Sequence, residues 1–432
     1  MTSDIRSLAV LGAQWGDEGK GKVVDYLASR AQVVARFQGG NNAGHTVVIG
    51  EQTYKMHHLP VGILYPGVWC LLGNGMVINP EVLVEELTSL EERGIDTSNL
   101  RISERAHVIL PFHRALDKGE ETFRGKNKIG TTGLGIGPAY ADRAYRRGLR
   151  MVDFIDREVF HSWLEENLPL QNAVLQKIHG HPGFSLSEIR DRYQPLVDRL
   201  APLVTDTSLL MQQHLDQGNK VLFEGSQGTL LDLEHGSYPY VTSSTTTTGG
   251  VISGLGIGPR MIREVLGVIK AYTTRVGEGP FPTEDLGEKG NYMREKGGEF
   301  GTTTGRPRRC GWFDGVIARY SARINGFTGW AVTKLDVLSG FEKLKMATSY
   351  YHKQGLQEEF PSQLKMLQGC FPKYQELDGW EEDITGARKI EQLPPEARRY
   401  LEAIEDLTGV KVVLVSTGPE REQTALSRGE II

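Results

Sequence analysis

The stretch that decides the fold is Val10-Leu-Gly-Ala-Gln-Trp-Gly-Asp-Glu-Gly-Lys-Gly-Lys-Val-Val-Asp25. It predicts a buried strand at 8–11, a glycine-rich turn with two lysines, and a helix after Lys22. Backbone N–H groups in such a turn converge on an anion, and the positive end of the following helix dipole adds to the attraction. This order of elements indicates a phosphate-binding loop.

The loop departs from the P-loop pattern G-x-x-x-x-G-K-[ST] at its last position. Residues 16–22 fit the pattern, but Val23 has no hydroxyl that could hold Mg²⁺. A bound ion would need another oxygen ligand, and the acids in the turn are Asp17 and Glu18. We expect Asp17 to be the ligand. The alternative is a glycine-rich surface turn that binds nothing.

The composition is that of a globular protein with a large core. The chain has 432 residues, 39% hydrophobic and 24% charged, and a net charge of −5. The acidic balance argues against a nucleic acid or an anionic membrane as the main partner. There is no apolar leader and no apolar run long enough to span a membrane. The cysteines, Cys70, Cys310 and Cys370, match neither a disulfide framework nor a zinc site, so we expect a cytoplasmic protein.

Predicted strands and helices alternate along the chain. Strands are expected at 32–37, 220–228, 265–272, 330–336 and 410–416, and helices at 79–93 and 395–407. A stretch at about 153–217 is helical in pattern, with breaks at Pro169, Pro182, Pro195 and Pro202. This predicts an α/β fold like that of P-loop NTPases, with a mostly parallel open central sheet flanked by helices and a helical insertion. We expect a single large catalytic domain over 1–432.

A candidate base-binding loop follows one predicted strand. Thr333-Lys-Leu-Asp336 is similar to the N/T-K-x-D loop of guanine-nucleotide proteins, in which the carboxylate accepts from both guanine N–H groups. Adenine cannot satisfy that carboxylate. Ser416-Thr-Gly418 would close the other side of the base, so we expect a guanine-binding part at about 330–432. Alone, the motif would more readily be a solvated Lys–Asp pair; it gains weight from the phosphate loop upstream.

Three further segments carry residues suited to anions and phosphoryl transfer. His45 ends the glycine turn Asn41-Asn-Ala-Gly-His45, where it could stabilise charge on a leaving phosphate oxygen, and Asp17 could act as a base on an acidic ring N–H. The segments 128–138, followed by several arginines, and 301–309 combine hydroxyls, glycines and guanidinium groups that suit a carboxylate or phosphate on a small metabolite. They suggest two anions besides a triphosphate.

The chain resembles the adenylosuccinate synthetase family, GTP-dependent ligases that join IMP and L-aspartate in AMP synthesis. The resemblance runs nearly end to end and rests on segments 14–22, 42–45, 135–140, 223–232, 238–244, 275–284 and 333–336.

The resemblance implies a two-step reaction. Asp17 would remove the N1 proton of IMP while its O6 attacks the γ-phosphorus of GTP, and His45 would stabilise the departing oxygen. The amino group of aspartate would then displace phosphate from 6-phosphoryl-IMP. Mg²⁺ would lie on Asp17 and the Gly44 carbonyl. The implied catalytic residues are Asp17, His45 and Gln227.

The resemblance also implies the binding residues. GTP would contact Gly16, Asp17, Glu18, Gly19, Lys20, Gly21, Lys22, Gly44, His45, Thr46, Arg308, Lys334, Leu335, Asp336, Ser416, Thr417 and Gly418. IMP and aspartate would contact Asn42, Ala43, Thr132, Arg146, Gln227, Thr242, Thr302, Thr303, Thr304, Gly305 and Arg306. Arg146 would come from the other subunit of a homodimer.

Some positions depart from the family pattern. Leu134 stands where a basic residue is common, Arg143 where lysine is usual, and Thr245–Thr248 differs from an asparagine-containing run. Two alternatives stay open. A regulatory GTPase would need Ser or Thr at Val23 and would leave the Thr/Arg loop unused. A sister ligase would use dGMP or another purine monophosphate.

Overall fold

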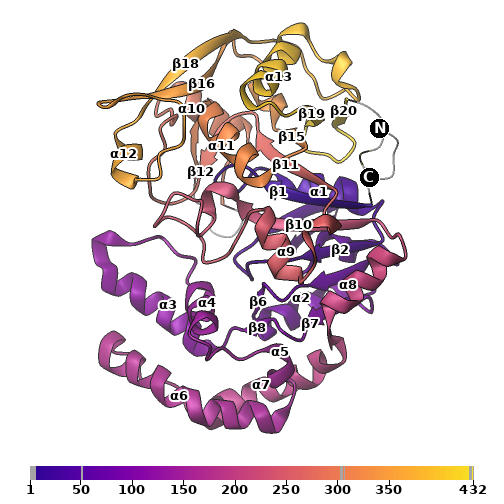
Figure 1. Ribbon diagram of the computed structural model, residues 1–432, viewed down its shortest axis with the longest axis vertical. Coiled ribbons are helices and arrows are strands. Elements are labelled where there is room, and N and C mark those ends of the chain that lie inside the picture. Colours follow the sequence, from indigo (N-terminus) through magenta and orange to yellow (C-terminus); the bar gives the residue numbers. More distant parts are fainter. Residues whose placement is uncertain (1–5, 50–51, 302–304, 306, 428–430, 432) are drawn as a thin grey trace.

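The computed structural model describes residues 6–49, 52–301, 305, 307–427 and 431. A ten-stranded sheet runs through the middle of the molecule (Figure 1) in the order β20-β19-β15-β11-β1-β10-β2-β5-β7-β9. Each neighbouring pair is parallel except β19 and β20. The predicted α/β fold with a mostly parallel open sheet is confirmed. The strands are β1 (Ser7–Gly12), β2 (Val33–Arg36), β5 (Trp69–Leu72), β7 (Leu100–Ser103), β9 (Val204–Thr205), β10 (Val221–Gly228), β11 (Glu264–Lys270), β15 (Gly329–Thr333), β19 (Val412–Ser416) and β20 (Thr424–Leu426).

The first strand lies in the centre of the sheet and is covered on both faces. Its side chains alternate between two cores: Leu8 and Val10 belong to one, Ala9 and Leu11 to the other. A parallel strand buried on both faces needs a continuous apolar run, which explains why this segment could be recognised from sequence. The loop after β1 is therefore held by a rigid element.

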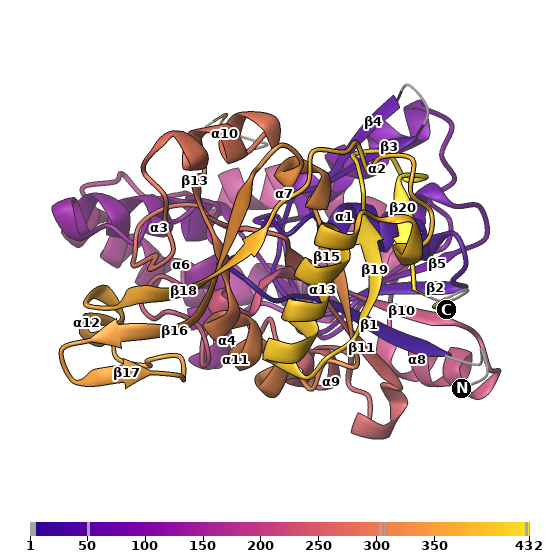
Figure 2. The same cartoon turned by 90° about the horizontal axis from the view of Figure 1, so that it is seen from above.

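Helices cover the two faces of the sheet (Figure 2). Side chains of α1 (Lys20–Ala28) and α2 (Pro80–Glu92) join the core that contains Leu8. Side chains of α9 (Thr248–Leu255), α11 (Gly315–Asn325) and α13 (Pro395–Thr408) join the other. Because parallel strands end at the same edge, the loops after β1, β10 and β15 meet there, which is the usual ligand edge of such sheets.

The region predicted as a helical insertion contains several long helices. They form the lower part of the molecule in Figure 1, together with α3 (Pro111–Arg124) and α4 (Ile136–Ala144). The predicted breaks at Pro169 and Pro195 are wrong, because helices continue through both. Both prolines are exposed, whereas Leu164, Leu168 and Val197 on the same helices are buried. Proline has no N–H group, so one backbone carbonyl in each helix loses its partner, and on the exposed side water can donate to that carbonyl instead. The helices are α5 (Met151–Phe154), α6 (Arg157–His179), α7 (Leu186–Leu200) and α8 (Thr207–Asp216).

Smaller sheets and two short helices surround the large sheet. A four-stranded sheet, which the sequence did not predict, consists of β14 (Phe313–Asp314), β16 (Lys343–His352), β17 (Gly355–Gln357) and β18 (Phe371–Asp378). Three two-stranded sheets pair β3 (His45–Ile49) with β4 (Gln52–Met56), β6 (Val77–Ile78) with β8 (His107–Val108), and β12 (Thr273–Arg275) with β13 (Arg309–Gly311). The remaining helices are α10 (Glu288–Lys296) and α12 (Leu364–Gln368). Among the described residues, no helix combines the length and the apolar character needed to cross a bilayer.

Candidate functional site

The loop between β1 and α1 is organised from inside by a buried carboxylate. Glu18 accepts hydrogen bonds from the backbone N–H groups of Gln14 (2.9 Å) and Gly16 (3.0 Å) and pairs with Lys20 at 2.5 Å. The Glu18 side chain is fully buried, and a buried charge is tolerable only when it is paired in this way. Glu18 and Lys20 therefore hold the loop together. The Asp17 carboxylate is the one left partly exposed.

Asp17 lies at the tip of this loop in an unusual backbone conformation. Its φ is +57°, and its carboxylate accepts a 2.8 Å hydrogen bond from Nε of Arg308. The non-glycine residues with positive φ in the described part of the chain are Asp17, Arg146, Gln227 and Lys334. All four are predicted site residues. A left-handed backbone costs energy for residues other than glycine, and such strain concentrates at functional sites.

A cavity of about 530 Å³ opens where the strand ends meet. It brings together most of the predicted site residues: Gly16, Asp17, Glu18, Gly19, Lys20, Gly21, Lys22, Asn42, Ala43, Gly44, His45, Thr132, Gln227, Thr242, Arg308 and Lys334. Predicted residues outside this lining are Arg146, Gly305, Leu335, Asp336, Ser416, Thr417 and Gly418. The side chain of Thr46, and Thr302, Thr303, Thr304 and Arg306 altogether, lie outside the described residues.

The predicted base-binding loop contains a buried acceptor with no partner. Oδ1 of Asp336 is buried without a hydrogen bond among the described residues, and burial raises the pKa of this carboxyl. Lys334 holds the loop by donating to the Gly297 carbonyl at 2.7 Å. A buried acceptor that the protein leaves unpaired suits a ligand that brings its own donors.

Lys22 links the phosphate loop to the last parallel strand. Its ammonium donates to Oγ of Ser416 (2.7 Å) and to the carbonyls of Gly418 (2.6 Å) and Gln423 (2.8 Å). Desolvation lowers the pKa of Lys22 to about 8. The sequence pattern suggested a phosphate contact for this lysine, but here its three donors are used by the 416–423 loop.

His45 is held by a carboxylate that the sequence analysis did not assign. Nδ1 of His45 pairs with Oε1 of Glu224, and Oε2 of Glu224 accepts from the backbone N–H of Val61 at 2.9 Å. Both side chains are buried. The signal that could have found Glu224 is a lone acid inside an otherwise apolar strand, since charged residues are seldom buried without a partner.

A second unassigned carboxylate, Glu299, forms the floor of the cavity next to Asp17. It accepts from Nζ of Lys270 (2.7 Å), the hydroxyl of Tyr272 (2.5 Å) and Nη1 of Arg308 (3.0 Å). Burial disfavours its charged form, but Lys270 and Tyr272 outweigh that effect, so the pKa of Glu299 lies below its ordinary value. Because Arg308 bonds both acids, Glu299 also fixes the cation that holds Asp17.

We expect Glu299→Gln to lower the free energy of unfolding by about 3–5 kcal/mol at pH 7, because it leaves Lys270 buried without its counter-charge. The pKa of Glu299 is lower in the folded protein than its ordinary value of 4.5 in the unfolded chain. Its ionised form therefore stabilises the fold at pH values above 4.5, and this stabilisation is lost as the pH falls through the folded pKa. Urea unfolding at pH 7 and pH 4 measures both effects. Glu295→Gln on the exposed side of α10 makes the same charge change and should unfold like the parent.

The predicted IMP-binding residues Asn42, Thr132, Gln227 and Thr242 line the same cavity. Asn42 Nδ2 reaches Oγ1 of Thr242 at 3.5 Å, and Oε1 of Gln227 accepts from Nε2 of Gln38 at 3.2 Å. The loop that carries Thr132 is held by Glu121, which accepts from the N–H groups of residues 129–131 at 3.1, 2.9 and 3.3 Å. Lining residues that the sequence did not assign include Thr131, Tyr240, Ser243 and Arg275.

The family model described as adenylosuccinate synthetase matches residues 9–425. The chain belongs to this family. The adenylosuccinate synthetase of Carboxydothermus hydrogenoformans is 56% identical over 420 residues, covering 97% of this chain and 98% of its own. That of Moorella thermoacetica is 55% identical over 418 residues, covering 97% and 98%.

Solved structures agree with the family. The fully ligated adenylosuccinate synthetase of Plasmodium falciparum superposes with a TM-score of 0.93 at 37% identity, covering 99% of this chain and 100% of that one. The cyanophage S-2L succinoaminodeoxyadenylate synthetase bound to dGMP superposes with a TM-score of 0.64 at 22% identity, covering 98% of this chain and 96% of that one. At this identity the likeness shows a shared fold alone. The chain is a GTP-dependent ligase of IMP and L-aspartate in AMP biosynthesis. A regulatory GTPase and a dGMP ligase are not favoured.

Proposed function

We propose that this adenylosuccinate synthetase family member carries out its reaction in the 530 Å³ cavity, with Asp17 as the general base. Asp17 would take the N1 proton of IMP while O6 attacks the γ-phosphorus of GTP, releasing GDP and leaving 6-phosphoryl-IMP. The amino group of aspartate would then attack C6 and expel phosphate. The observation that carries this proposal is the Asp17 carboxylate, held at the cavity wall by a left-handed backbone and by Arg308.

His45 would stabilise the oxygen that leaves as GDP forms. With Nδ1 of His45 taken by Glu224, the other ring nitrogen, Nε2, is the one available to a ligand in the cavity. A donor fixed in advance stabilises developing negative charge more than a mobile one, because it need not reorganise during the reaction. Gln227, also on a left-handed backbone, would be the third catalytic side chain on the IMP side.

GTP would span the cavity between two loops that Lys22 joins. The triphosphate would lie on residues 16–21, on the backbone of Lys22, and on Gly44 and His45, with Arg308 nearby. Thr46 follows His45 and would join this set. Guanine would lie between Lys334-Leu-Asp336 and Ser416-Thr-Gly418, where its two N–H donors would satisfy the unpaired Asp336 oxygen.

The residues present fit a Mg²⁺ ion bound largely by phosphates. Mg²⁺ usually takes one or two protein oxygens and completes its shell with substrate phosphates and water. Among the described residues no group of three or more His, Cys, Asp or Glu side chains could hold a metal, whereas Asp17 is partly exposed and Gly44 faces open space. Asp17 and the Gly44 carbonyl would hold the ion, which would neutralise charge on the transferring phosphate.

IMP and aspartate would occupy the remaining wall and the 301–308 loop. We propose that IMP meets Asn42, Ala43, Thr132, Gln227 and Thr242, all of which line the cavity. For Thr302, Thr303, Thr304, Gly305 and Arg306 the support is the family resemblance, together with Arg308, which ends this loop at Asp17.

A homodimer would complete each site with Arg146 from the other subunit. Arg146 follows α4, is exposed, has a φ of +61°, and does not line the cavity of its own chain. Its neighbour Tyr145 is 71% exposed, as expected for a side chain that a second subunit covers. A strained, exposed arginine that does not line the cavity of the described chain supports a role across an interface.

Mixing two inactive variants tests the shared site. Arg146→Ala and Asp17→Asn homodimers should each be nearly inactive, but an equal mixture should regain about one quarter of the parent activity, because half of the dimers are mixed and each has one intact site. Activity is followed as phosphate release after the subunits have exchanged. No recovery, with subunit exchange verified by mass, would place Arg146 in its own subunit's site or outside any site.

The proposed location is the cytoplasm. Cys70, Cys310 and Cys370 are all buried and unpaired. Unpaired thiols are usual in reducing compartments, whereas secreted proteins tend to pair them.

A further inference from the structure

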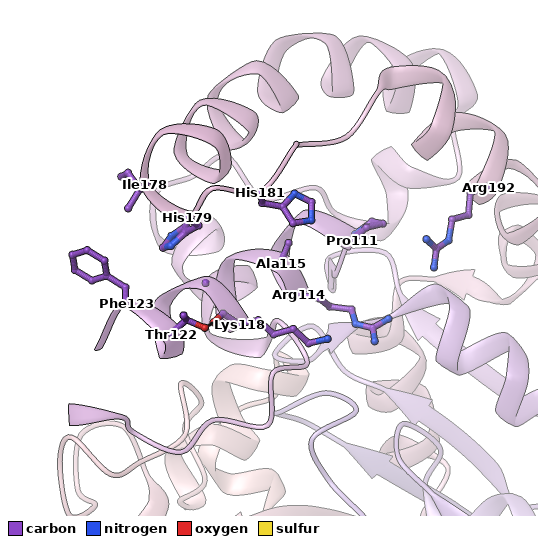
Figure 3. A pocket seen from close by; sticks show the side chains of 11 residues that line it. Pro111, Arg114, Ala115, Lys118, Thr122, Phe123, Ile178, His179, His181 and Arg192 are labelled. Atoms are coloured by element: carbon purple, nitrogen blue, oxygen red, sulfur yellow. Dashed lines mark hydrogen bonds between the residues drawn. The ribbon is translucent and has the colours of Figure 1, made fainter. Parts of the chain in front are cut away.

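A second cavity, of about 490 Å³, lies between α3 and the end of α6, apart from the large cavity (Figure 3). None of its lining residues is acidic, three carry a permanent positive charge, and two are histidines. They are Pro111, Arg114, Ala115, Lys118, Gly119, Thr122, Phe123, Ile178, His179, His181 and Arg192. The reaction proposed above uses none of them.

The contact between the two helices at this cavity is closely fitted. A Cβ on Gly119 would lie 2.6 Å from Cγ of His179, so only glycine lets the imidazole pack against α3. Nδ1 of His179 is buried and has no hydrogen-bond partner among the described residues. A buried polar atom without a partner is costly, and a ligand in the cavity could supply one.

The positive charge in the cavity is only partly neutralised. Arg192 pairs with Glu81 on α2, but neither Arg114 nor Lys118 forms an ion pair with any carboxylate among the described residues. In Figure 3 the side chains of Arg114 and Lys118 extend from α3 in the same direction, and His179 and His181 lie across from that helix. The Thr122 hydroxyl already donates to the Lys118 carbonyl at 2.9 Å. The two cations are therefore the groups that suit a phosphate.

Apolar surface adjoins these cations. Ile178 and Phe123, which are 57% and 77% exposed, lie at the outer end of the cavity (Figure 3). A cavity that combines a few convergent polar groups with apolar walls suits a small molecule that has both kinds of surface.

We propose that this cavity binds a small phosphorylated anion that carries an apolar or aromatic group. Arg114 and Lys118 would hold the phosphate, His179 would donate or accept one hydrogen bond, and Ile178 and Phe123 would contact the apolar group. This goes beyond the ligase reaction, which is proposed to take place in the 530 Å³ cavity.

The second cavity lies close to the loop at 129–135, which carries Thr132. On its other side α3 holds that loop: Oδ2 of Asp117 accepts from the N–H of Gly135 at 2.9 Å, and Glu121 accepts from residues 129–131. The stem of Lys118 also lies against the loop, because a Cβ on Gly133 would be 3.4 Å from Cγ of Lys118. A ligand on Lys118 would therefore sit beside the segment that carries Thr132.

Equilibrium binding of phenyl phosphate to the full chain tests the proposal, with saturating IMP and GDP present to fill the large cavity and again without them. With the nucleotides present we expect one molecule to bind, and more tightly than inorganic phosphate. The double variant Arg114→Gln/Lys118→Gln should bind about tenfold more weakly or worse, because two charge-assisted contacts are lost. The control Arg124→Gln/Lys126→Gln removes the same charge from exposed residues that line neither cavity and should bind like the parent.

Several results would overturn the proposal. These are no phenyl phosphate binding when the nucleotides are present, equal weakening in both double variants, or equal affinity for phenyl and inorganic phosphate. A change from dimer to monomer in Phe123→Ser would instead identify this surface as a subunit contact. Since neither Arg114 nor Lys118 has an ion-pair partner in the part of the chain that the structure describes, the double variant should fold normally, and its thermal unfolding checks this.

Discussion

Asp17→Asn is expected to lower kcat for adenylosuccinate formation by at least about 1,000-fold, because a positioned general base contributes up to about 10⁴-fold and an amide cannot take the proton. The same change weakens the proposed Mg²⁺ ligand. Asparagine tolerates a positive φ nearly as well as aspartate does, and its Oδ1 can still accept from Arg308. The loop should therefore keep its shape, and the thermal unfolding temperature should stay close to that of the parent.

The assay follows phosphate release and the shift of the product's ultraviolet absorption to longer wavelengths than that of IMP. GTP, IMP, aspartate and Mg²⁺ should all be required. Asp191→Asn, an exposed aspartate on α7, is the matched control and should be fully active. Substantial activity in Asp17→Asn would remove its assigned role, and equal GTP turnover without IMP or aspartate would point to a GTPase.

Asp336→Asn should have the second largest effect, raising KM for GTP by about 100-fold or more. The Asp336 carboxylate is proposed to accept hydrogen bonds from two guanine N–H groups. In the asparagine variant the side-chain NH₂ group would face one of these N–H groups, and two buried donors would be left without an acceptor. Xanthosine triphosphate has a carbonyl in place of the guanine amino group and should become the better substrate. Because burial raises the pKa of Asp336, GTP binding by the parent should weaken on acidification sooner than an ordinary aspartate would allow.

Steady-state kinetics with the two triphosphates measure this exchange of specificity, and the pH dependence of KM for GTP measures the titration. Asp383→Asn, on an exposed turn, changes the same charge and should leave both values alone. If Asp336→Asn kept the parent's preference for GTP, guanine would have to bind elsewhere.

The central part of the fold could be predicted because its strands are buried on both faces. The strand expected at 8–11 is β1 (Ser7–Gly12), with all six residues buried. By contrast, β18 is mostly exposed or half-buried along its length, so it has no apolar run to mark it. Helices through Pro169 and Pro195 were missed because proline was treated as a helix breaker without regard to its position on the exposed side of an amphipathic helix.

The site could be predicted where its residues are close in sequence, as in the loop around Asp17. Contacts between distant segments could not: Arg308 reaches Asp17 across 291 positions, and Glu224 reaches His45 from another strand. Lys22 shows the limit of a local motif. The spacing of the glycine-rich motif predicted that Lys22 contacts phosphate. Its ammonium instead donates to Ser416, and this contact depends on the position of β19 in the sheet, which a local motif does not reveal.

The central place of β1 has a consequence for synthesis on the ribosome. Its two neighbours, β10 and β11, are encoded more than about 200 residues downstream, which at about 5–20 residues per second is a delay of roughly ten seconds or more. During that time an apolar strand leaves the exit tunnel with both of its hydrogen-bonding edges bare. The nascent chain should therefore need a chaperone for this strand, long before the loop at 416–423 emerges to meet Lys22.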